Sequence, residues 1–304
     1  MSRESPTAIL SRLSHQHCGV FRIEEANAVG VTANQVQGLR RSGVVERVLP
    51  NTYRLLAVPH SAEQDLRAAL MWVGDRAAVA GRSAAVRYRL EGVRAPRPEI
   101  VVPLGRRART TFATVYHGDP RALMVRMVDG LPTTGVEATL LRLAHLLDPE
   151  AFEIACEDAR RRRLTSVPAL RRYLERHARR GRVGVASLRR ALDELDPEHP
   201  ARSVLEVRTR RLLVAHGLDD FVREFPLEWR GHTYRYDFAF PTHRVILETN
   251  GRRWHDDATD YEHDNEKWSV PGRWGYRIVF ATWGKLDRRP EELIDELRAA
   301  MTQT

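Results

Sequence analysis

Lysine is nearly absent from this 304-residue chain. Lys267 and Lys285 are its only two lysines, so arginine supplies almost all of its 49 basic side chains. A GC-rich genome, in which arginine codons are favoured, would explain the choice of arginine over lysine. It does not explain the excess of positive over negative charge, which gives a net charge of +9. That excess favours a polyanionic partner.

Cysteine and long apolar runs are also scarce. Cys18 and Cys156 lie far apart and have no partner motif, so we expect ordinary core residues in a reducing cytoplasm. No apolar run approaches the length of a membrane span, and the first residues lack the apolar core of a signal peptide. These absences predict a cytoplasmic protein with no membrane partner.

The first segment, residues 1–58, has the pattern of a winged helix-turn-helix. An amphipathic helix starts at Ile9, and a short strand-like piece leads from Phe21 to a second helical stretch. Thr32 is a good N-cap for a helix from Ala33 to Ser42. Two alternating runs follow, joined by Pro50-Asn51. Helix, turn, helix and wing predict a DNA-binding head.

Polar side chains of this segment are candidates for contacts with bases or phosphates. They are Thr32, Asn34, Gln35, Gln37, Arg40, Arg41 and Arg54. The alternative is a protein–protein module in which these residues form a solvated face.

The segment resembles the N-terminal domain of AbiEi-type antitoxins of type IV toxin–antitoxin systems. The resemblance rests on Gly19-Val20-Phe21, Glu25-Ala26, Gly30-Val31-Thr32, Leu39-Arg40-Arg41-Ser42-Gly43 and Arg47-Val48-Leu49-Pro50-Asn51-Thr52-Tyr53-Arg54. It implies a regulatory head that binds DNA. It also implies a second partner for the protein, a nucleotidyltransferase-type toxin.

The middle segment, residues 59–198, predicts a mixed α/β domain. We expect helices over 63–72, 151–162 and 167–178, strands over 99–103, 114–117 and 123–128, and a helix opened by 132–134. Gly81-Arg82-Ser83-Ala84-Ala85 and Leu131-Pro132-Thr133-Thr134 resemble the second half of the same antitoxin group. Arginine clusters that include Arg161 and Arg162 indicate a phosphate-tracking face. The alternative is a solvated face paired with Glu153, Glu157, Asp158 and Glu175.

The last segment, residues 199–304, begins after a break at Asp196-Pro197-Glu198-His199-Pro200. Its central feature is a predicted hairpin in which Asp237 lies in one apolar run and Glu248 ends the next. Acids at the same end of two adjacent strands can meet across the sheet, and two such carboxylates suit a hard divalent cation. We therefore expect Asp237 and Glu248 to bind Mg²⁺ or Mn²⁺.

A helix with a glutamate, a hairpin with aspartate then glutamate, a helix, a strand and a final helix follow in order. This order resembles the PD-(D/E)xK nuclease superfamily, and within it a group similar to very-short-patch-repair (Vsr) endonucleases. The motif is Asp237-Phe238-Ala239-Phe240-Pro241, Val245-Ile246-Leu247-Glu248-Thr249-Asn250-Gly251, Trp254-His255, Asp264-Asn265 and Trp274-Gly275-Tyr276-Arg277-Ile278-Val279. The resemblance covers about a third of the chain and implies a restriction-endonuclease-like α/β/α domain.

Cleaving a phosphodiester calls for a metal that polarises the phosphoryl oxygen and activates water. Besides the two ligands, Glu206 is placed to orient a water, and His255 to assist the leaving oxygen or hold the scissile phosphate. Asn250 departs from the family pattern, which has lysine at that position, or commonly aspartate in the Vsr-like group. Asparagine neither acts as a base nor supplies charge. Lys267, on the following helix, is a candidate substitute.

Two functions follow for this multi-domain α/β chain. The first is a metal-dependent endonuclease of defence or repair type that acts on double-stranded DNA. The second is an antitoxin-like transcriptional regulator whose nuclease fold is degenerate and serves only to grip DNA. Asn250 favours the second, and the joint presence of Glu206, Asp237, Glu248 and His255 favours the first.

Overall fold

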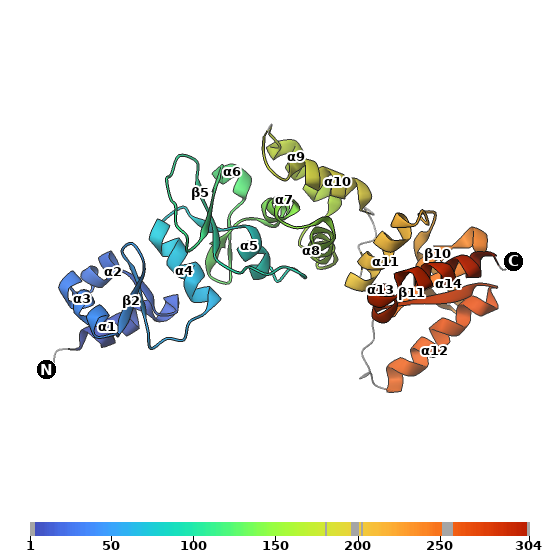
Figure 1. The fold of residues 1–304 in the computed structure, drawn as a ribbon, viewed down its shortest axis with the longest axis horizontal. Helices are drawn as coiled ribbons and strands as arrows, with labels where there is room; N and C mark the ends of the chain where they lie inside the picture. The colour runs from blue at the N-terminus through green and yellow to red at the C-terminus, as the bar shows by residue number, and fades with distance from the viewer. Residues whose placement is uncertain (1–3, 180, 196–200, 202, 251–257, 303–304) are drawn as a thin grey trace. The chain divides into compact units, whose positions relative to one another are not determined.

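The computed structural model describes residues 4–179, 181–195, 201, 203–250 and 258–302, and for 258–265 it describes the backbone only. Its contacts divide the chain into two compact units (Figure 1). Unit 1 comprises 1–159 and 164–193, and unit 2 comprises 160–163 and 194–304. The division falls close to the predicted break at 196–200, a stretch that itself lies outside the described residues. In the described ranges, no helix combines the length and the apolar character needed to cross a membrane.

The head, residues 4–58, packs three helices against a three-stranded antiparallel sheet of order β1-β3-β2. Its elements are α1 Pro6–Ser14, β1 Val20–Arg22, α2 Ile23–Ala28, α3 Ala33–Arg41, β2 Val45–Leu49 and β3 Thr52–Leu55. Thr32 begins α3 as predicted, because its hydroxyl accepts a hydrogen bond from the Gln35 amide while the Gln35 side chain accepts one from the Thr32 amide. Leu10, Phe21 and Val36 are fully buried and anchor the core.

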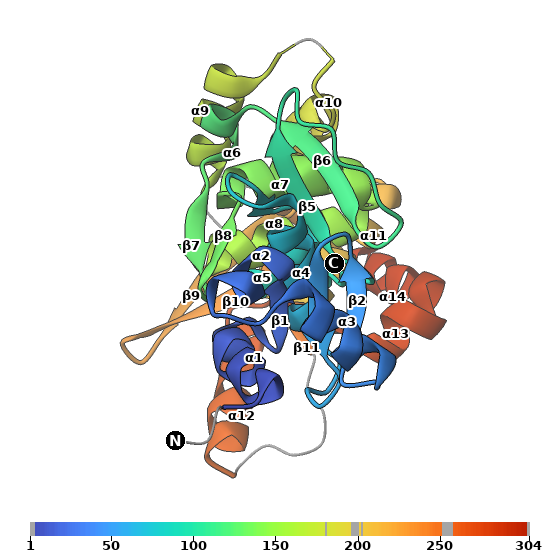
Figure 2. The same cartoon turned by 90° about the vertical axis from the view of Figure 1, so that its left-hand side faces the viewer.

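The remainder of unit 1 is built on a five-stranded mixed sheet of order β6-β5-β4-β8-β7, with the β7–β8 hairpin at one edge (Figure 2). Helix α4 packs on both this sheet and the head sheet, and α5 packs on α7. The elements are α4 Ala62–Val73, β4 Ala78–Val79, α5 Gly81–Arg87, β5 Glu99–Pro103, β6 Thr114–Gly118, α6 Pro120–Leu123, β7 Arg126–Val128, β8 Leu131–Thr133, α7 Val136–Leu146, α8 Pro149–Arg161, α9 Val167–His177 and α10 Val185–Glu194.

Two of the predictions for this sheet are wrong. The stretch 123–128 is not one strand, because Pro120 starts the short helix α6 and Met124 ends it with a left-handed backbone (φ 48°). The stretch 132–134 does not open a helix. Pro132 lies in β8 opposite Met127, and α7 begins only at Val136.

The segment Gly81-Arg82-Ser83, noted in the sequence for its family resemblance, clamps a buried carboxylate. Glu99 is 3% exposed, and its Oε2 accepts hydrogen bonds from the Arg82 amide at 2.8 Å and the Tyr116 hydroxyl at 3.0 Å. The Glu99 amide donates to Ser83 Oγ at 2.9 Å. Gly81 has φ +54°, and a Cβ there would lie 2.0 Å from Glu99 Oε2. Glycine is therefore required for this approach.

Unit 2 is a four-stranded sheet of order β12-β11-β10-β9 with helices on both faces. Strands β9, β10 and β11 are antiparallel, and β11 pairs parallel with β12 through the crossover helix α12. Helix α12 covers one face, and α11 and α14 cover the other (Figure 1). The elements are α11 Val204–Ala215, β9 Val222–Trp229, β10 His232–Phe240, β11 Val245–Asn250, α12 Ala258–Arg273, β12 Arg277–Thr282, α13 Trp283–Arg288 and α14 Pro290–Thr302.

The order of elements that the sequence predicts for unit 2 is present. Strand β9 runs through Pro226, which sits opposite Arg235 without interrupting the pairing. The Ser203 hydroxyl caps α11 by accepting a hydrogen bond from the Glu206 amide at 3.1 Å. The two faces of the sheet bury separate apolar clusters, one around Phe238 and Leu247 and one around Tyr236 and Ile246.

Candidate functional site

The hairpin β10–β11 brings the two predicted carboxylates together. Phe238 pairs with Leu247, and continuing this register sets Asp237 opposite Glu248. The Asp237 amide donates to Glu248 Oε2 at 3.1 Å, and the Thr249 amide donates to Asp237 Oδ2 at 2.8 Å. The Thr249 hydroxyl also donates to Asp237 Oδ2. Thr249 thus holds the Asp237 carboxylate through both its amide and its hydroxyl.

Lys267 meets this pair from helix α12. Its Nζ donates to Glu248 Oε1. The helix is fixed at this point because the Tyr236 hydroxyl donates to the Lys267 carbonyl at 2.6 Å, and Lys267 Nζ lies 5.2 Å from the Tyr236 ring centroid. The Lys267 side chain is 20% exposed and that of Glu248 9%. Lys267 is therefore held beside the two carboxylates, and its side chain is still accessible to a ligand.

Two acids so close together carry an electrostatic cost. Burial raises the pKa of Glu248 to about 7, and the neighbouring Asp237 carboxylate adds to the rise while Lys267 opposes it. Within the described part of the chain, Asp237 Oδ1 accepts no hydrogen bond, so one oxygen of the pair is left for an additional ligand. A cation would relieve the repulsion between the acids, and hard oxygen donors suit Mg²⁺ or Mn²⁺.

The other predicted catalytic residues divide by location. Asn250 follows Glu248 by two positions on β11 and so lies on the same side of the strand, where it pairs in register with Thr282. Glu206 is 1% exposed, and its Oε1 accepts a hydrogen bond from Arg223 Nη2 at 2.6 Å. That ion pair ties α11 to β9. His255 lies outside the described residues.

No group of three or more histidine, cysteine, aspartate or glutamate side chains arranged for a metal occurs in the ranges that the structure describes. The acidic pair and Lys267 are therefore the candidate centre. The sequence supplied all three residues, but Lys267 only as one option, because its distance from the strand depends on how α12 crosses the sheet.

The predicted DNA-binding residues of the head fall into two groups. Asn34, Arg40 and Arg41 lie exposed on α3. Thr32 and Gln35 cap that helix, and Gln37 Nε2 donates to the Tyr53 hydroxyl at 3.2 Å. Arg54 donates to Glu46 Oε2 at 2.9 Å and to Gln64 Oε1 at 3.1 Å, which connects β3 to β2 and α4. The second group has partners within the fold, and so does Arg40 of the first, whose Nη1 donates to Gln37 Oε1 at 3.1 Å.

The arginine cluster at the end of α8 is less exposed than the sequence suggests. Arg160 is 6% exposed, Arg161 is half-buried and donates to the Ala201 carbonyl at 3.4 Å, and Arg162 is exposed. Glu153, Glu157 and Asp158 on the same helix are buried, at 2–4% exposed, so they do not form the solvated face considered as an alternative.

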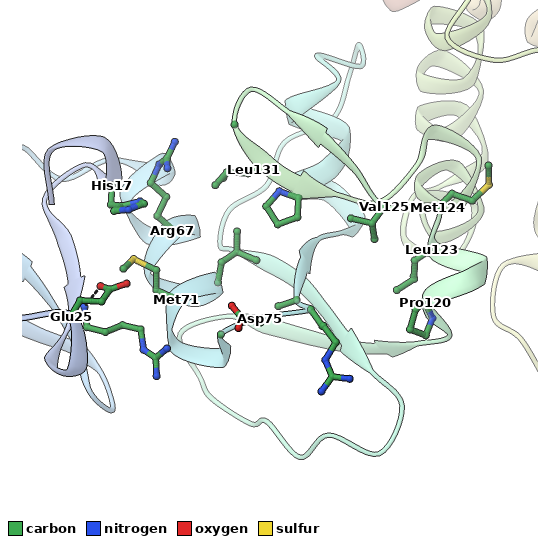
Figure 3. Close-up of a pocket in the computed structure, with 17 residues that line it drawn as sticks. His17, Glu25, Arg67, Met71, Asp75, Pro120, Leu123, Met124, Val125 and Leu131 are labelled. Carbon is green, nitrogen blue, oxygen red and sulfur yellow. Dashed lines mark hydrogen bonds between the residues drawn. The ribbon is translucent and has the colours of Figure 1, made fainter. Parts of the chain in front are cut away.

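Unit 1 also contains a cleft of about 800 Å³ that holds none of the predicted site residues. Figure 3 shows His17, Glu25, Arg67 and Met71 on one side of it and the apolar side chains of α6 and the residues after it on the other. Arg67 is paired with Glu63 at 2.9 Å. No sequence pattern that we considered indicates this cleft.

Comparison with known proteins finds relatives without an assigned activity. No protein-family model matches the chain. The uncharacterized proteins Rv2248 and MT2308 of Mycobacterium tuberculosis are each 27% identical over 192 residues, which cover 62% of this chain and 68% of the relative. Among solved structures, the crystal structure of RV2827C protein from Mycobacterium tuberculosis is similar with a TM-score of 0.47 and 19% identity, covering 68% of this chain and 82% of that chain.

Proposed function

We propose that the chain is a DNA-directed, divalent-metal-dependent endonuclease. In this proposal unit 2 is a nuclease core of the PD-(D/E)xK type, and the head is a winged helix that binds double-stranded DNA. The observation that carries the proposal is the meeting of Asp237, Glu248 and Lys267 at one end of the β10–β11 hairpin. Two carboxylates and one ammonium group are the residue types that metal-assisted phosphodiester hydrolysis requires.

The acidic pair fits a cation on its own chemistry. Asp237 Oδ1 lacks a hydrogen-bond partner in the described ranges, and Glu248 is held on a buried strand whose environment disfavours its bare charge. Asp237 and Glu248 would hold Mg²⁺ or Mn²⁺. When bound, such an ion supplies Lewis acidity to the phosphoryl group.

The side chains around the pair then have distinct tasks. Thr249 fixes the Asp237 carboxylate through its amide and hydroxyl, which orients the remaining oxygen. Lys267 leaves Glu248 to donate to a phosphate oxygen, a charge-assisted hydrogen bond that strengthens as negative charge develops. Asn250, on the same side of β11, offers an amide donor to a water or to phosphate without taking a proton.

Plasmid cleavage tests the proposal. Supercoiled plasmid is incubated with the full chain and Mg²⁺ or Mn²⁺, beside Asp237→Ala and Glu248→Ala. We expect nicked or linear products from the unaltered protein only, and none when the metal is chelated. Cutting that persists in both variants would refute this active site.

Asn250 favours a second candidate, a DNA-binding regulator of the antitoxin type with a non-catalytic nuclease fold. Asparagine stands where the superfamily resemblance calls for lysine, and it removes one charge from the strand. The same plasmid assay separates the two candidates, because metal-independent DNA binding without any cutting supports the regulator. A neighbouring gene for a nucleotidyltransferase-type toxin would further support it.

Replacing Arg40 and Arg41 together by alanine should weaken DNA binding in a salt-dependent way. Each phosphate contact that is lost lowers the slope of log affinity against log salt by about 1. Fluorescence anisotropy with duplex DNA over a salt series measures that slope. Arg12→Ala, which removes an exposed charge of α1 that pairs with Glu4 at 2.7 Å, is the control. An unchanged slope in the double variant would exclude α3 as the binding helix.

Metal affinity should rise with pH around neutrality. Burial raises the pKa of Glu248 to about 7, so below that pH the side chain carries a proton that a cation must displace. We expect calorimetric Mn²⁺ affinity to increase from about pH 6 to about pH 8 and then level off. A pH-independent affinity over this interval would contradict a Glu248 ligand that carries a proton near neutrality.

A further inference from the structure

A small, half-enclosed cavity lies in unit 1, in the region after the head. Its volume is about 40 Å³, and the residues that define its chemistry are Gly81, Tyr116, Thr134, Arg142 and Arg182. This is room for about three water-sized groups, at roughly 10–15 Å³ each. The cavity belongs neither to the candidate nuclease centre nor to the head.

Arg142 reaches the cavity from α7 with its charge uncompensated. Its guanidinium carbon lies 4.4 Å from the centroid of the Tyr116 ring, on which it stacks. In the part of the chain that the structure describes, no hydrogen bond or ion pair to Arg142 is formed. Burial lowers the pKa of Arg142 and the charge of Arg182 lowers it further, while Tyr116 and the Glu99 carboxylate oppose the fall. Burying a guanidinium group without a paired carboxylate costs free energy, unless a ligand supplies the negative charge and the hydrogen-bond acceptors.

Arg182 approaches the same cavity from the segment after α9 and is rigidly held. Its Nη1 donates to the His177 carbonyl and its Nη2 to the Tyr173 hydroxyl, both at 2.7 Å. These bonds use two of its five N–H donors, and the rest remain for a ligand. Gly184, with φ +87°, lets the segment pass close to α7, because a Cβ there would lie 2.1 Å from the Leu141 carbonyl oxygen.

Glu99, the acid beside the cavity, already has hydrogen-bond and ion-pair partners. Glu99 accepts from the Arg82 amide and the Tyr116 hydroxyl through Oε2, and from Arg82 Nη1 through Oε1 at 3.1 Å. Its charge is therefore balanced by Arg82. Arg142 and Arg182 are left as two positive charges that face one small space, an arrangement that matches a small oxyanion.

We propose that this cavity binds a phosphate group through Arg142 and Arg182. Guanidinium groups present paired N–H donors that match phosphate oxygens. The volume admits the oxygens of one phosphate and excludes a sugar or a base. The group is therefore either free inorganic phosphate or the terminal phosphate of a nucleotide or strand that remains outside.

Isothermal titration of the full chain with inorganic phosphate, without metal, tests the site. We expect saturable binding, at least tenfold weaker in Arg142→Ala and in Arg142→Lys. The lysine variant keeps the charge and the stem but loses the paired donors, and circular dichroism verifies its fold. Arg171→Ala is the matched control, since Arg171 is an exposed arginine of α9 already paired with Asp193. Absence of saturable binding, or equal affinity in Arg142→Ala, would overturn the proposal.

A second binding experiment identifies the source of the phosphate group. A 5′-phosphorylated oligonucleotide is compared with its unphosphorylated counterpart in the unaltered protein and in Arg142→Lys. A preference for the phosphorylated end that disappears in the variant identifies a strand end as the ligand. Equal binding of both oligonucleotides, with inorganic phosphate retained, identifies the free ion. Neither experiment uses metal or cleavage, so failure of the nuclease proposal leaves this result unaffected.

Discussion

Lys267→Met is expected to reduce metal-dependent DNA cleavage about 100- to 1,000-fold, the usual cost of removing one preorganised charge or donor from a phosphoryl-transfer site. The lysine is the ammonium group that the structure places against Glu248, and Asn250 on β11 cannot replace its charge. DNA affinity in the absence of metal should change little, because only one of 49 basic side chains is lost and that side chain is 20% exposed. Initial rates of plasmid nicking at saturating Mn²⁺ measure the effect.

Lys285→Met provides a matched control, since it removes the only other lysine. Lys285 lies on α13 and pairs with Glu296 of α14, away from the acidic pair. Its replacement should leave the nicking rate unchanged. If the two variants nick at the same rate, Lys267 has no part in the chemistry.

Gly81→Ala is expected to destabilise unit 1 by about 3 kcal/mol or more, among the larger effects of single substitutions. A left-handed backbone costs a non-glycine residue about 1–2 kcal/mol. The new Cβ would also overlap Glu99 Oε2, built at a separation of 2.0 Å. Moving that carboxylate breaks its bonds to Arg82 and Tyr116 and leaves buried partners unsatisfied. Urea unfolding, followed by circular dichroism, measures the loss.

The Gly130→Ala variant separates the two contributions. Gly130 also has a left-handed backbone, φ +78°, but a Cβ there meets nothing within 4 Å. The Gly130→Ala substitution should lower the free energy of unfolding only by the cost of the left-handed backbone, about 1–2 kcal/mol. Equal losses in the two variants would mean that Glu99 moves aside without penalty and that the clamp at the start of α5 is not a stabilising feature.

Unit 2 was the most predictable part of the chain because its strands carry strong local patterns. The apolar runs around Asp237 and Glu248 and the intervening Pro241 define a hairpin, and the spacing of the acids then sets them opposite each other. Lys267 is different, since its position depends on the crossing of α12 over the sheet. Tyr236 fixes that crossing through the backbone of Lys267, and no periodicity in the sequence encodes such a contact.

The middle of the chain was harder to predict because its strands are very short. β4 has two residues, and β7 and β8 have three each, too few for alternation to be recognised. Pro132 in β8 was therefore interpreted as the start of a helix. In the head, the pattern Thr32-x-x-Gln35 is a capping signal, and both side chains do cap α3. Arg142 stood alone in the sequence and gave no indication of the cavity.

The scarcity of lysine gives the chain a built-in spectroscopic probe. Protein grown with isotope-labelled lysine would show two side-chain signals, one from Lys285 beside Glu296 and one from Lys267 beside the acidic pair. The Lys267 signal should shift on addition of Mg²⁺. Lys267 donates to a Glu248 oxygen, and a cation bound by Glu248 would weaken that hydrogen bond. Occupancy of the centre can thus be followed residue by residue, in solution and without any nucleic acid.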